Sequence, residues 1–232
     1  MTRRSFLWCV LALLLSACAL LYIGRFTDID LRLADAVFDV GANDFPWREN
    51  WFFASFMHHE MKAMCMGVGM VPVVSLIADS VLGNTLFDEE LRRRLLIVVA
   101  SAILIPLTIS TMKGMSVHHC PWSLQRYGGF APYLRILADA PPTVSNGHCF
   151  PAGHASSGLW IASVAVFWLP RSPQKALIAF VLGLLPGLAL GLAQQIRGAH
   201  FLTHTLWSVW ITALIILILS KLLTKCSVQE FG

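Results

Sequence analysis

Six apolar runs, each about as long as a lipid bilayer is thick, constrain the fold of this chain more than any other feature. They cover residues 6–23, 63–82, 95–112, 155–169, 176–193 and 205–220. A hydrocarbon core of about 30 Å takes roughly 20 helical residues, and continuous runs favour helices over the alternating pattern of a β-barrel. With 56% hydrophobic and only 13% charged residues, the chain is too apolar for a soluble domain. We therefore expect a single all-α domain over residues 1–232, a membrane-embedded bundle of six transmembrane helices with no nucleic-acid partner.

Basic residues that flank the runs predict the orientation of the bundle. One set falls on a single side when the chain is threaded through six spans: Arg3, Arg4, Arg92, Arg93, Arg94, Arg171, Lys175, Lys221 and Lys225. The positive-inside rule assigns that side to the cytoplasm. The loops 27–61, 113–153 and 194–204 then share the exoplasmic side. We expect a bacterial inner-membrane protein whose active-site loops face the periplasm.

A competing interpretation concerns the first run, because Leu15-Ser16-Ala17-Cys18 resembles a lipoprotein cleavage site. Cleavage at that site would remove the first span. The apolar run continues beyond Cys18 as far as Ile23, however, and this continuation favours a retained transmembrane helix.

Three histidine-bearing segments lie where the exoplasmic loops meet the spans. In chain order they are Lys113-Gly114-Met115-Ser116-Val117-His118-His119-Cys120-Pro121, Cys149-Phe150-Pro151-Ala152-Gly153-His154 and Gln194-Gln195-Ile196-Arg197-Gly198-Ala199-His200-Phe201-Leu202-Thr203-His204. A single ionisable residue at a helix end is usually an interfacial side chain. At membrane depth each one costs at least about 2.5 kcal/mol, so several that converge on one face indicate a functional site.

The residue types in these segments suit phosphoryl transfer, which needs cations and amide hydrogens around charged oxygens, a nucleophile, and an acid for the leaving oxygen. Lys113 and Arg197 supply positive charge. The turn that ends at His154 opens a helix, and helix N-termini bind anions through their free amide hydrogens. Gly153 in that turn lets the backbone approach an oxyanion closely. The sequence therefore predicts a phosphate site at the exoplasmic face.

Together the segments resemble the three motifs of the type 2 phosphatidic acid phosphatase superfamily, which are integral membrane lipid phosphatases. Those motifs run Lys-x6-Arg-Pro, Pro-Ser-Gly-His and Ser-Arg-x5-His-x3-Asp, and the resemblance extends from the second span onward. It implies that His200 is the nucleophile and forms a phosphohistidine, that His154 protonates the leaving group, and that Lys113 binds phosphate. It also implies that the protein needs neither a metal ion nor another cofactor.

The chain departs from these motifs at three phosphate-binding positions. Cys120 stands in place of the first arginine, Ala152 in place of the serine, and Gln194 in place of the second arginine. The change at Ala152 removes one hydroxyl donor and leaves the backbone amides intact. The phosphate site must therefore be built partly from other residues.

Residues near the motifs are candidates for the missing charges. His119 or Arg126 can replace the first arginine. Arg197 lies three positions before His200, and residues three apart on a helix share a face. We therefore expect Arg197 to reach the same phosphate from one helical turn further along.

A fourth departure concerns the residue that orients the nucleophile, because His204 replaces the aspartate of the family. A neutral imidazole accepts a hydrogen bond from His200 and fixes its tautomer, but it supplies no negative charge. A carboxylate elsewhere in the chain, such as Asp139, is a candidate for that charge.

For two pairs of side chains in the exoplasmic loops, the sequence allows more than one interpretation. Cys120 and Cys149 share one loop, and both a disulfide and two free thiols fit the sequence, because it does not fix the Cα separation. His58 and His59 are either ligands or, as we expect, a solvated interfacial pair.

We expect an enzyme that hydrolyses a phosphate ester or diphosphate on a lipid or lipid-linked substrate. Phosphatidate-type lipids, polyprenyl diphosphates and saccharide-lipid phosphates all fit an anion site at a membrane face. A phosphotransferase that passes the phosphate to another lipid would use the same nucleophile. A non-catalytic, lipid-binding member of the fold is a further alternative.

Two other classes are less favoured by the sequence. A metal or haem protein would explain the crowding of imidazoles and thiols in one loop, although their spacing matches no strong metal motif. The residues concerned are His118, His119, Cys120, His148 and Cys149. A transporter is disfavoured because Asp79, the intramembrane acidic residue available for coupling, lies near a cytoplasmic end.

Overall fold

The computed structural model describes residues 3–225, which form helices and loops and contain two isolated bridges but no β-strand. The long helices are α1 (Arg3–Phe26), α3 (Met61–Val81), α4 (Glu89–Gly114), α6 (Pro173–Ile196) and α7 (Leu202–Lys225). The shorter elements are α2 (Ile29–Asp35), the π-helix η1 (Phe52–Glu60), the 3-10 helices η2 (Pro121–Ser123) and η3 (Gln125–Tyr127), α5 (Gly153–Leu159) and the 3-10 helix η4 (Trp160–Trp168).

Five helical segments are long and apolar enough to cross a membrane, so the chain is an integral membrane protein. They are Arg3–Phe26, Phe52–Val81, Glu89–Gly114, Pro173–Ile196 and Leu202–Leu223. They match five of the six predicted apolar runs, the second of which extends one residue past its helix to Leu82, and the all-α class is confirmed for the described residues. The second segment joins η1 and α3 into one continuous helix of 30 residues.

The remaining predicted run, residues 155–169, folds differently from the others. Its helix begins at Gly153, before the run itself, and α5 gives way after Leu159 to the nine-residue 3-10 helix η4. A 3-10 helix rises about 2.0 Å per residue against about 1.5 Å in an α-helix, so α5 and η4 together extend roughly 28 Å. That length is close to the thickness of a hydrocarbon core, and the sixth span stays a prediction.

The core of the bundle lies between α4, η4, α6 and α7. Ile105, Ile109 and Trp160 are among its buried residues, with Ile211 and Ile216 from α7. The α5 and α6 backbones touch, because a Cβ on Gly158 would lie only 2.6 Å from the backbone nitrogen of Gly187. Small residues at such contacts are typical of helices that pack inside a membrane.

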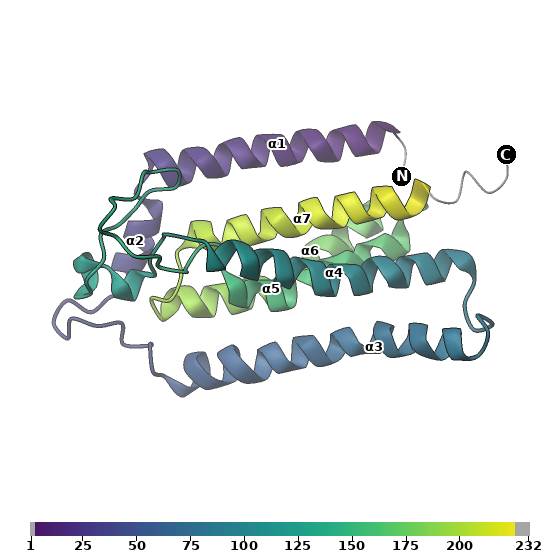
Figure 1. The fold of residues 1–232 in the computed structure, drawn as a ribbon, viewed down its shortest axis with the longest axis horizontal. Coiled ribbons are helices and arrows are strands. Elements are labelled where there is room, and N and C mark those ends of the chain that lie inside the picture. Colours follow the sequence, from purple (N-terminus) through teal and green to yellow (C-terminus); the bar gives the residue numbers. More distant parts are fainter. Residues whose placement is uncertain (1–2, 226–232) are drawn as a thin grey trace.

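Helices α1 and α3 lie at opposite edges of the bundle (Figure 1). The most apolar part of α1 has no buried residue, which fits a helix that faces lipid. It is attached to the bundle at Trp210 of α7, whose indole nitrogen donates a hydrogen bond of 2.9 Å to the carbonyl of Leu13.

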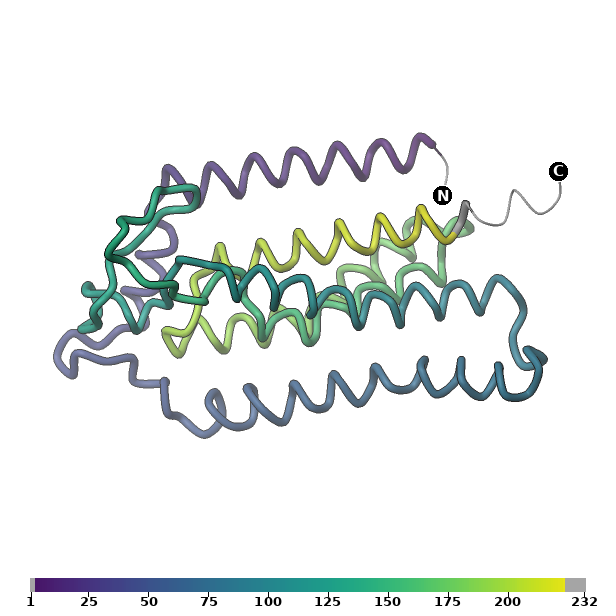
Figure 2. The backbone as a smooth tube through the Cα atoms, in the orientation of Figure 1, coloured from purple at the N-terminus to yellow at the C-terminus, as the bar shows by residue number. Residues whose placement is uncertain are grey.

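The two ends of the bundle differ in what they carry. The start of α1, the connection between α3 and α4, and the end of α7 share one end (Figure 1). Figure 2 shows the loops before η1 and before α5 gathered with α2 at the other end. All three histidine-bearing segments lie at that second end, as predicted from the span pattern.

Candidate active site

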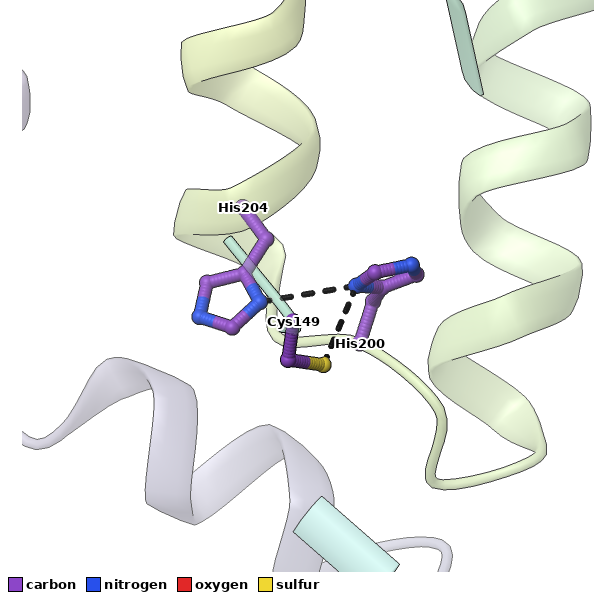
Figure 3. A group of neighbouring side chains, drawn as sticks. All are labelled: Cys149, His200 and His204. Carbon is purple, nitrogen blue, oxygen red and sulfur yellow. Dashed lines mark hydrogen bonds between the residues drawn. The ribbon is translucent and has the colours of Figure 1, made fainter. Parts of the chain in front are cut away.

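His200 and His204 form the centre of a buried cluster where α6 turns into α7. His200 lies in the turn before α7 and His204 in the first turn of α7, with 4% and 3% of their surfaces exposed. Their Nδ1 atoms are 3.5 Å apart, at the long limit of a hydrogen bond. Figure 3 shows Nδ1 of His200 facing both His204 and the sulfur of Cys149.

Gly198 allows the turn that delivers His200. Its φ is +72°, and a Cβ there would lie 2.5 Å from the ring of Phe45. Only glycine fits that conformation and that contact without strain. The Gly198 carbonyl accepts a hydrogen bond of 2.9 Å from the backbone nitrogen of Trp122, which attaches the turn to the first histidine-bearing loop.

The second segment is held against the start of α7. The backbone nitrogen of Ala152 donates to the carbonyl of His204 at 3.1 Å, and the Ser208 hydroxyl donates to the carbonyl of Ala152 at 3.1 Å. These bonds place the ring of His154 6.4 Å from that of His200, centroid to centroid. The Nδ1 atom of His154 is buried and has no hydrogen-bond partner among the described residues.

The first segment is tied to the second by a disulfide. Cys120 and Cys149 are bonded, with their Cα atoms 5.3 Å apart, and the backbone nitrogen of Cys149 donates to the carbonyl of His118 at 3.1 Å. The sulfur of Cys149 lies 3.1 Å from the carbonyl oxygen of Ala199, next to His200. The sulfur of Cys149 therefore lies within 4.8 Å of both central histidine Nδ1 atoms.

A cavity of about 500 Å³ begins at this site and continues between α3 and α4. Its polar end is formed by Lys62, Lys113, Gly153 and His154. The rest is lined largely by apolar side chains of the two helices: Met66, Met70, Val73, Val99, Ala102, Ile103 and Pro106. His200 is not among the residues that line the cavity, and its ring lies 6.4 Å from that of His154, centroid to centroid.

A family model described as the PAP2 superfamily matches residues 94–227, which is more than half of the chain. The chain belongs to the PAP2 superfamily. The match begins in α4 and includes all three histidine-bearing segments, whereas α1, α2, η1 and α3 precede it. No curated protein and no solved structure matches the chain. PAP2 superfamily members are phosphatases, and this membership fits a membrane phosphatase.

Three positions of the PAP2 motifs, Lys113, Gly153 and His154, line the cavity. Lys113 and Gly153 are neighbours, since a Cβ on Gly153 would lie 3.9 Å from the Lys113 ammonium. Arg197 is buried near them, and its charge acts on His154. Its Nε donates to the carbonyl of Arg48 at 2.8 Å and its Nη1 to the amide oxygen of Gln194 at 3.2 Å. Gln194 thus positions Arg197.

The two candidates for the missing first arginine do not line the cavity. His119 is buried, and a hydrogen bond of 2.9 Å joins its Nε2 to the carbonyl of Ser145. Arg126 is paired with Asp35 on α2 through two hydrogen bonds of 2.8 and 2.7 Å. A phosphate role for either residue stays a prediction, and the contacts that we observe are structural.

Residues outside the family match supply groups that the sequence analysis did not assign to the site. Lys62 lines the cavity beside Lys113. His58, expected to be solvated, is instead half-buried with its ring 4.0 Å from that of His154. The expected pair is present, because Nδ1 of His58 lies 3.2 Å from Nε2 of His59, but only His59 is exposed, whereas His58 also packs against His154. A π-helix of nine residues is rare and is typical of functional sites.

The buried carboxylate at the start of α7 belongs to Asp30, not to Asp139, which is exposed. Asp30 accepts hydrogen bonds from the backbone nitrogen of Thr203, at 3.0 Å, and from the Thr203 hydroxyl. It therefore caps α7 between His200 and His204. Burial raises the pKa of Asp30, and its hydrogen bonds with Thr203 oppose that shift.

Burial also sets the protonation of the histidines. It lowers the pKa of His200 well below the usual histidine value, and the neighbouring His204 and Lys113 lower it further. Burial and the neighbouring His58 lower the pKa of His154 to about 3. Both rings are therefore neutral near pH 7 when no anion is bound, which leaves each with a nitrogen lone pair.

Proposed function

We propose that the chain hydrolyses a phosphate ester or diphosphate of a lipid or lipid-linked substrate at the exoplasmic face, with His200 as the nucleophile. The observation that carries this proposal is the cavity, because one opening joins Lys113 and His154 to an apolar channel between two membrane helices. A phosphate at one end and an acyl or prenyl chain along the other would fill both parts of it.

The orientation of His200 suits attack through Nε2. Its Nδ1 faces Nδ1 of His204 and the disulfide sulfur, each at 3.5 Å. When His204 accepts the Nδ1 hydrogen, the lone pair of His200 is on Nε2, at the opposite edge of the ring. Nε2 then forms the bond to phosphorus as the bond between phosphorus and the leaving oxygen breaks.

His154 is placed to protonate that leaving oxygen. It lines the cavity, and its ring lies 6.4 Å from the ring of His200, so a phosphoryl group held between them is within reach of both. In the empty site His154 is neutral. A bound phosphate brings negative charge, which raises the pKa of His154 and lets it carry the proton that the leaving group takes. Water then attacks the phosphohistidine, and His154 accepts the proton of that water.

Three cations surround the position of the phosphate. Lys113, Lys62 and Arg197 all act electrostatically on His154. Lys113 and Arg197 come from the family-matched part of the chain, and Lys62 comes from α3. We propose that Lys62 replaces charge lost where Cys120 stands for the arginine of the motif. His58 packs against His154 and keeps that ring in position.

The test is phosphate release from lipid phosphates in detergent micelles, with Lys175→Ala as the control because Lys175 is exposed at the opposite end of the bundle. His200→Ala should lose at least about 1,000-fold in kcat, as expected for removal of a nucleophile. A chelator should leave the rate unchanged. Full turnover by His200→Ala would contradict the proposal. The same assay with an acceptor lipid added distinguishes transfer of the phosphate from hydrolysis.

The lipid part of the proposal has a separate test. Ala102→Phe puts a bulky ring into the apolar part of the cavity, whereas Leu107→Phe changes an exposed residue of the same helix that lies outside it. We expect Ala102→Phe to lower the rate with a lipid phosphate and to leave that with a soluble aryl phosphate unchanged. Equal rates of both variants on the lipid would contradict a lipid-binding cavity.

A further inference from the structure

Three potential ligand atoms, one of them a sulfur of the disulfide, have the arrangement of a metal site. The sulfur of Cys149 and the Nδ1 atoms of His200 and His204 all lie within 4.8 Å of one another, and all three residues are buried. Figure 3 shows both imidazole nitrogens directed toward the same small space as the sulfur. Thiolate and imidazole are the ligands that zinc prefers.

The distances fit a tetrahedral ion. Zinc binds sulfur at about 2.3 Å and imidazole nitrogen at about 2.0–2.1 Å, so two such ligands at a tetrahedral angle lie about 3.3–3.6 Å apart. The distance from Cys149 Sγ to His200 Nδ1 is 3.5 Å, and that from His200 Nδ1 to His204 Nδ1 is 3.5 Å. Two of the three distances between pairs of ligand atoms are therefore already those required for a tetrahedral ion.

The disulfide prevents this site from binding metal. While Cys149 is bonded to Cys120, its sulfur carries no thiolate charge and is a poor ligand. A dithiol can attack the sulfur of Cys120, which is half-buried, and release Cys149 as the leaving thiolate. The second thiol of the reagent then displaces Cys120, so the protein gains two electrons and two protons while the dithiol becomes a disulfide.

We propose that the chain with a reduced Cys120–Cys149 pair has a site for zinc or another borderline-soft divalent ion, formed by Cys149, His200 and His204. A thiolate and two neutral imidazoles supply three ligands, and a water molecule or a phosphate oxygen completes the tetrahedron. Binding releases the thiol proton of Cys149 and leaves one net positive charge, which an anion at the fourth position offsets. The disulfide thus keeps metal away from the site.

Metal binding would also stop the chemistry that we propose for His200, and this step alone rests on the proposed function. An imidazole that binds metal through Nδ1 carries its hydrogen on Nε2. The Nε2 lone pair needed for attack on phosphorus is then absent. Zinc should inhibit the reduced protein and leave the disulfide-bonded protein active.

Cobalt, a spectroscopic substitute for zinc, tests the site directly in the full chain in detergent. Cys120→Ser leaves Cys149 as a free thiol without any reductant, and the Cys120→Ser/Cys149→Ser double variant gives the background of the other cysteines. We expect Cys120→Ser to bind one cobalt ion per chain, with a sulfur-to-cobalt charge-transfer band and the visible bands of tetrahedral cobalt. Zinc should remove these bands, and the double variant and the oxidised wild type should lack them.

The wild type, reduced with dithiothreitol and desalted without oxygen, repeats the test if Cys120→Ser does not fold. In size-exclusion chromatography, an unchanged elution volume shows that the reduced protein remains folded. The absence of a cobalt band above background in such protein would overturn the proposal. Retention of the band in Cys120→Ser/His204→Ala would overturn the ligand set. The spectroscopic result does not depend on catalysis, so a chain that binds cobalt but hydrolyses no lipid phosphate would refute only the proposed function.

Discussion

The part of the chain that matches the PAP2 superfamily and the part that precedes it contribute differently to one site. The matched part, residues 94–227, contains the motif residues Lys113, Gly153, His154 and His200, together with Arg197 and with His204 at the aspartate position. The preceding helices supply contacts to those residues, through Lys62 at the cavity, His58 against His154 and Asp30 beneath α7. We propose that residues from the region before the family match replace the groups that the motifs have lost.

The largest expected difference between the two parts concerns His154, which lines the cavity, and His58, whose ring lies 4.0 Å from that of His154. His154→Ala should lower kcat by about 100- to 10,000-fold, because it removes the acid. His58→Phe keeps a ring against His154 and should lose less than about tenfold, as expected if His58 positions and does not transfer protons. Steady-state kinetics on one lipid phosphate measure both, and equal losses would mean that the preceding part takes a direct catalytic role.

A smaller effect is expected where α2 supports α7. Asp30→Ala leaves the buried Thr203 nitrogen without its acceptor and should lower the free energy of unfolding by about 1–3 kcal/mol. Asp28→Ala is the matched control, since Asp28 forms an exposed ion pair with Arg135 worth less than about 1 kcal/mol. Denaturant unfolding in detergent compares them. Equal stabilities would show that the Asp30 cap does not hold the active-site helix.

The smallest predicted effect is that of Lys62. Lys62→Ala should raise KM about three- to tenfold with little change in kcat, because an exposed cation attracts the phosphate but does not touch the bond that breaks. Lys175→Ala, at the opposite end of the bundle, should change neither constant. A fall in kcat with unchanged KM would instead place Lys62 at the transition state.

Hydropathy was sufficient to predict the five long spans, because continuous apolar runs allow only helices in lipid. It could not predict the 3-10 helix η4, whose form depends on how closely Gly158 and Gly183 let the backbones of α5 and η4 approach α6. The positions of Lys113, His154 and His200 predicted a shared site because each lies where a loop meets a helix at the same end of the bundle.

The remaining groups of the site were not predictable from local pattern. Lys62 and His58 reach the cavity only because η1 and α3 pack beside α4, which is a matter of tertiary structure. The π-helix η1, which carries His58, has no distinctive sequence pattern. Asp30 lies 173 residues from Thr203 in the chain, so its role as a cap was hidden, although its place among apolar residues of α2 was a usable sign that it is buried.

The most direct test of the account is whether phosphate becomes covalently attached to His200. A lipid phosphate labelled in the phosphoryl group, mixed with wild-type protein and quenched within one turnover, should give an acid-labile, alkali-stable label on the peptide that contains His200. The label should be absent from His200→Ala. With a substrate that has a good leaving group, the label should accumulate in His154→Ala to at least the wild-type level, because water attack on the phosphohistidine is slow without His154. Single-turnover phosphate release without any labelled protein, or a label that persists in His200→Ala, would contradict it.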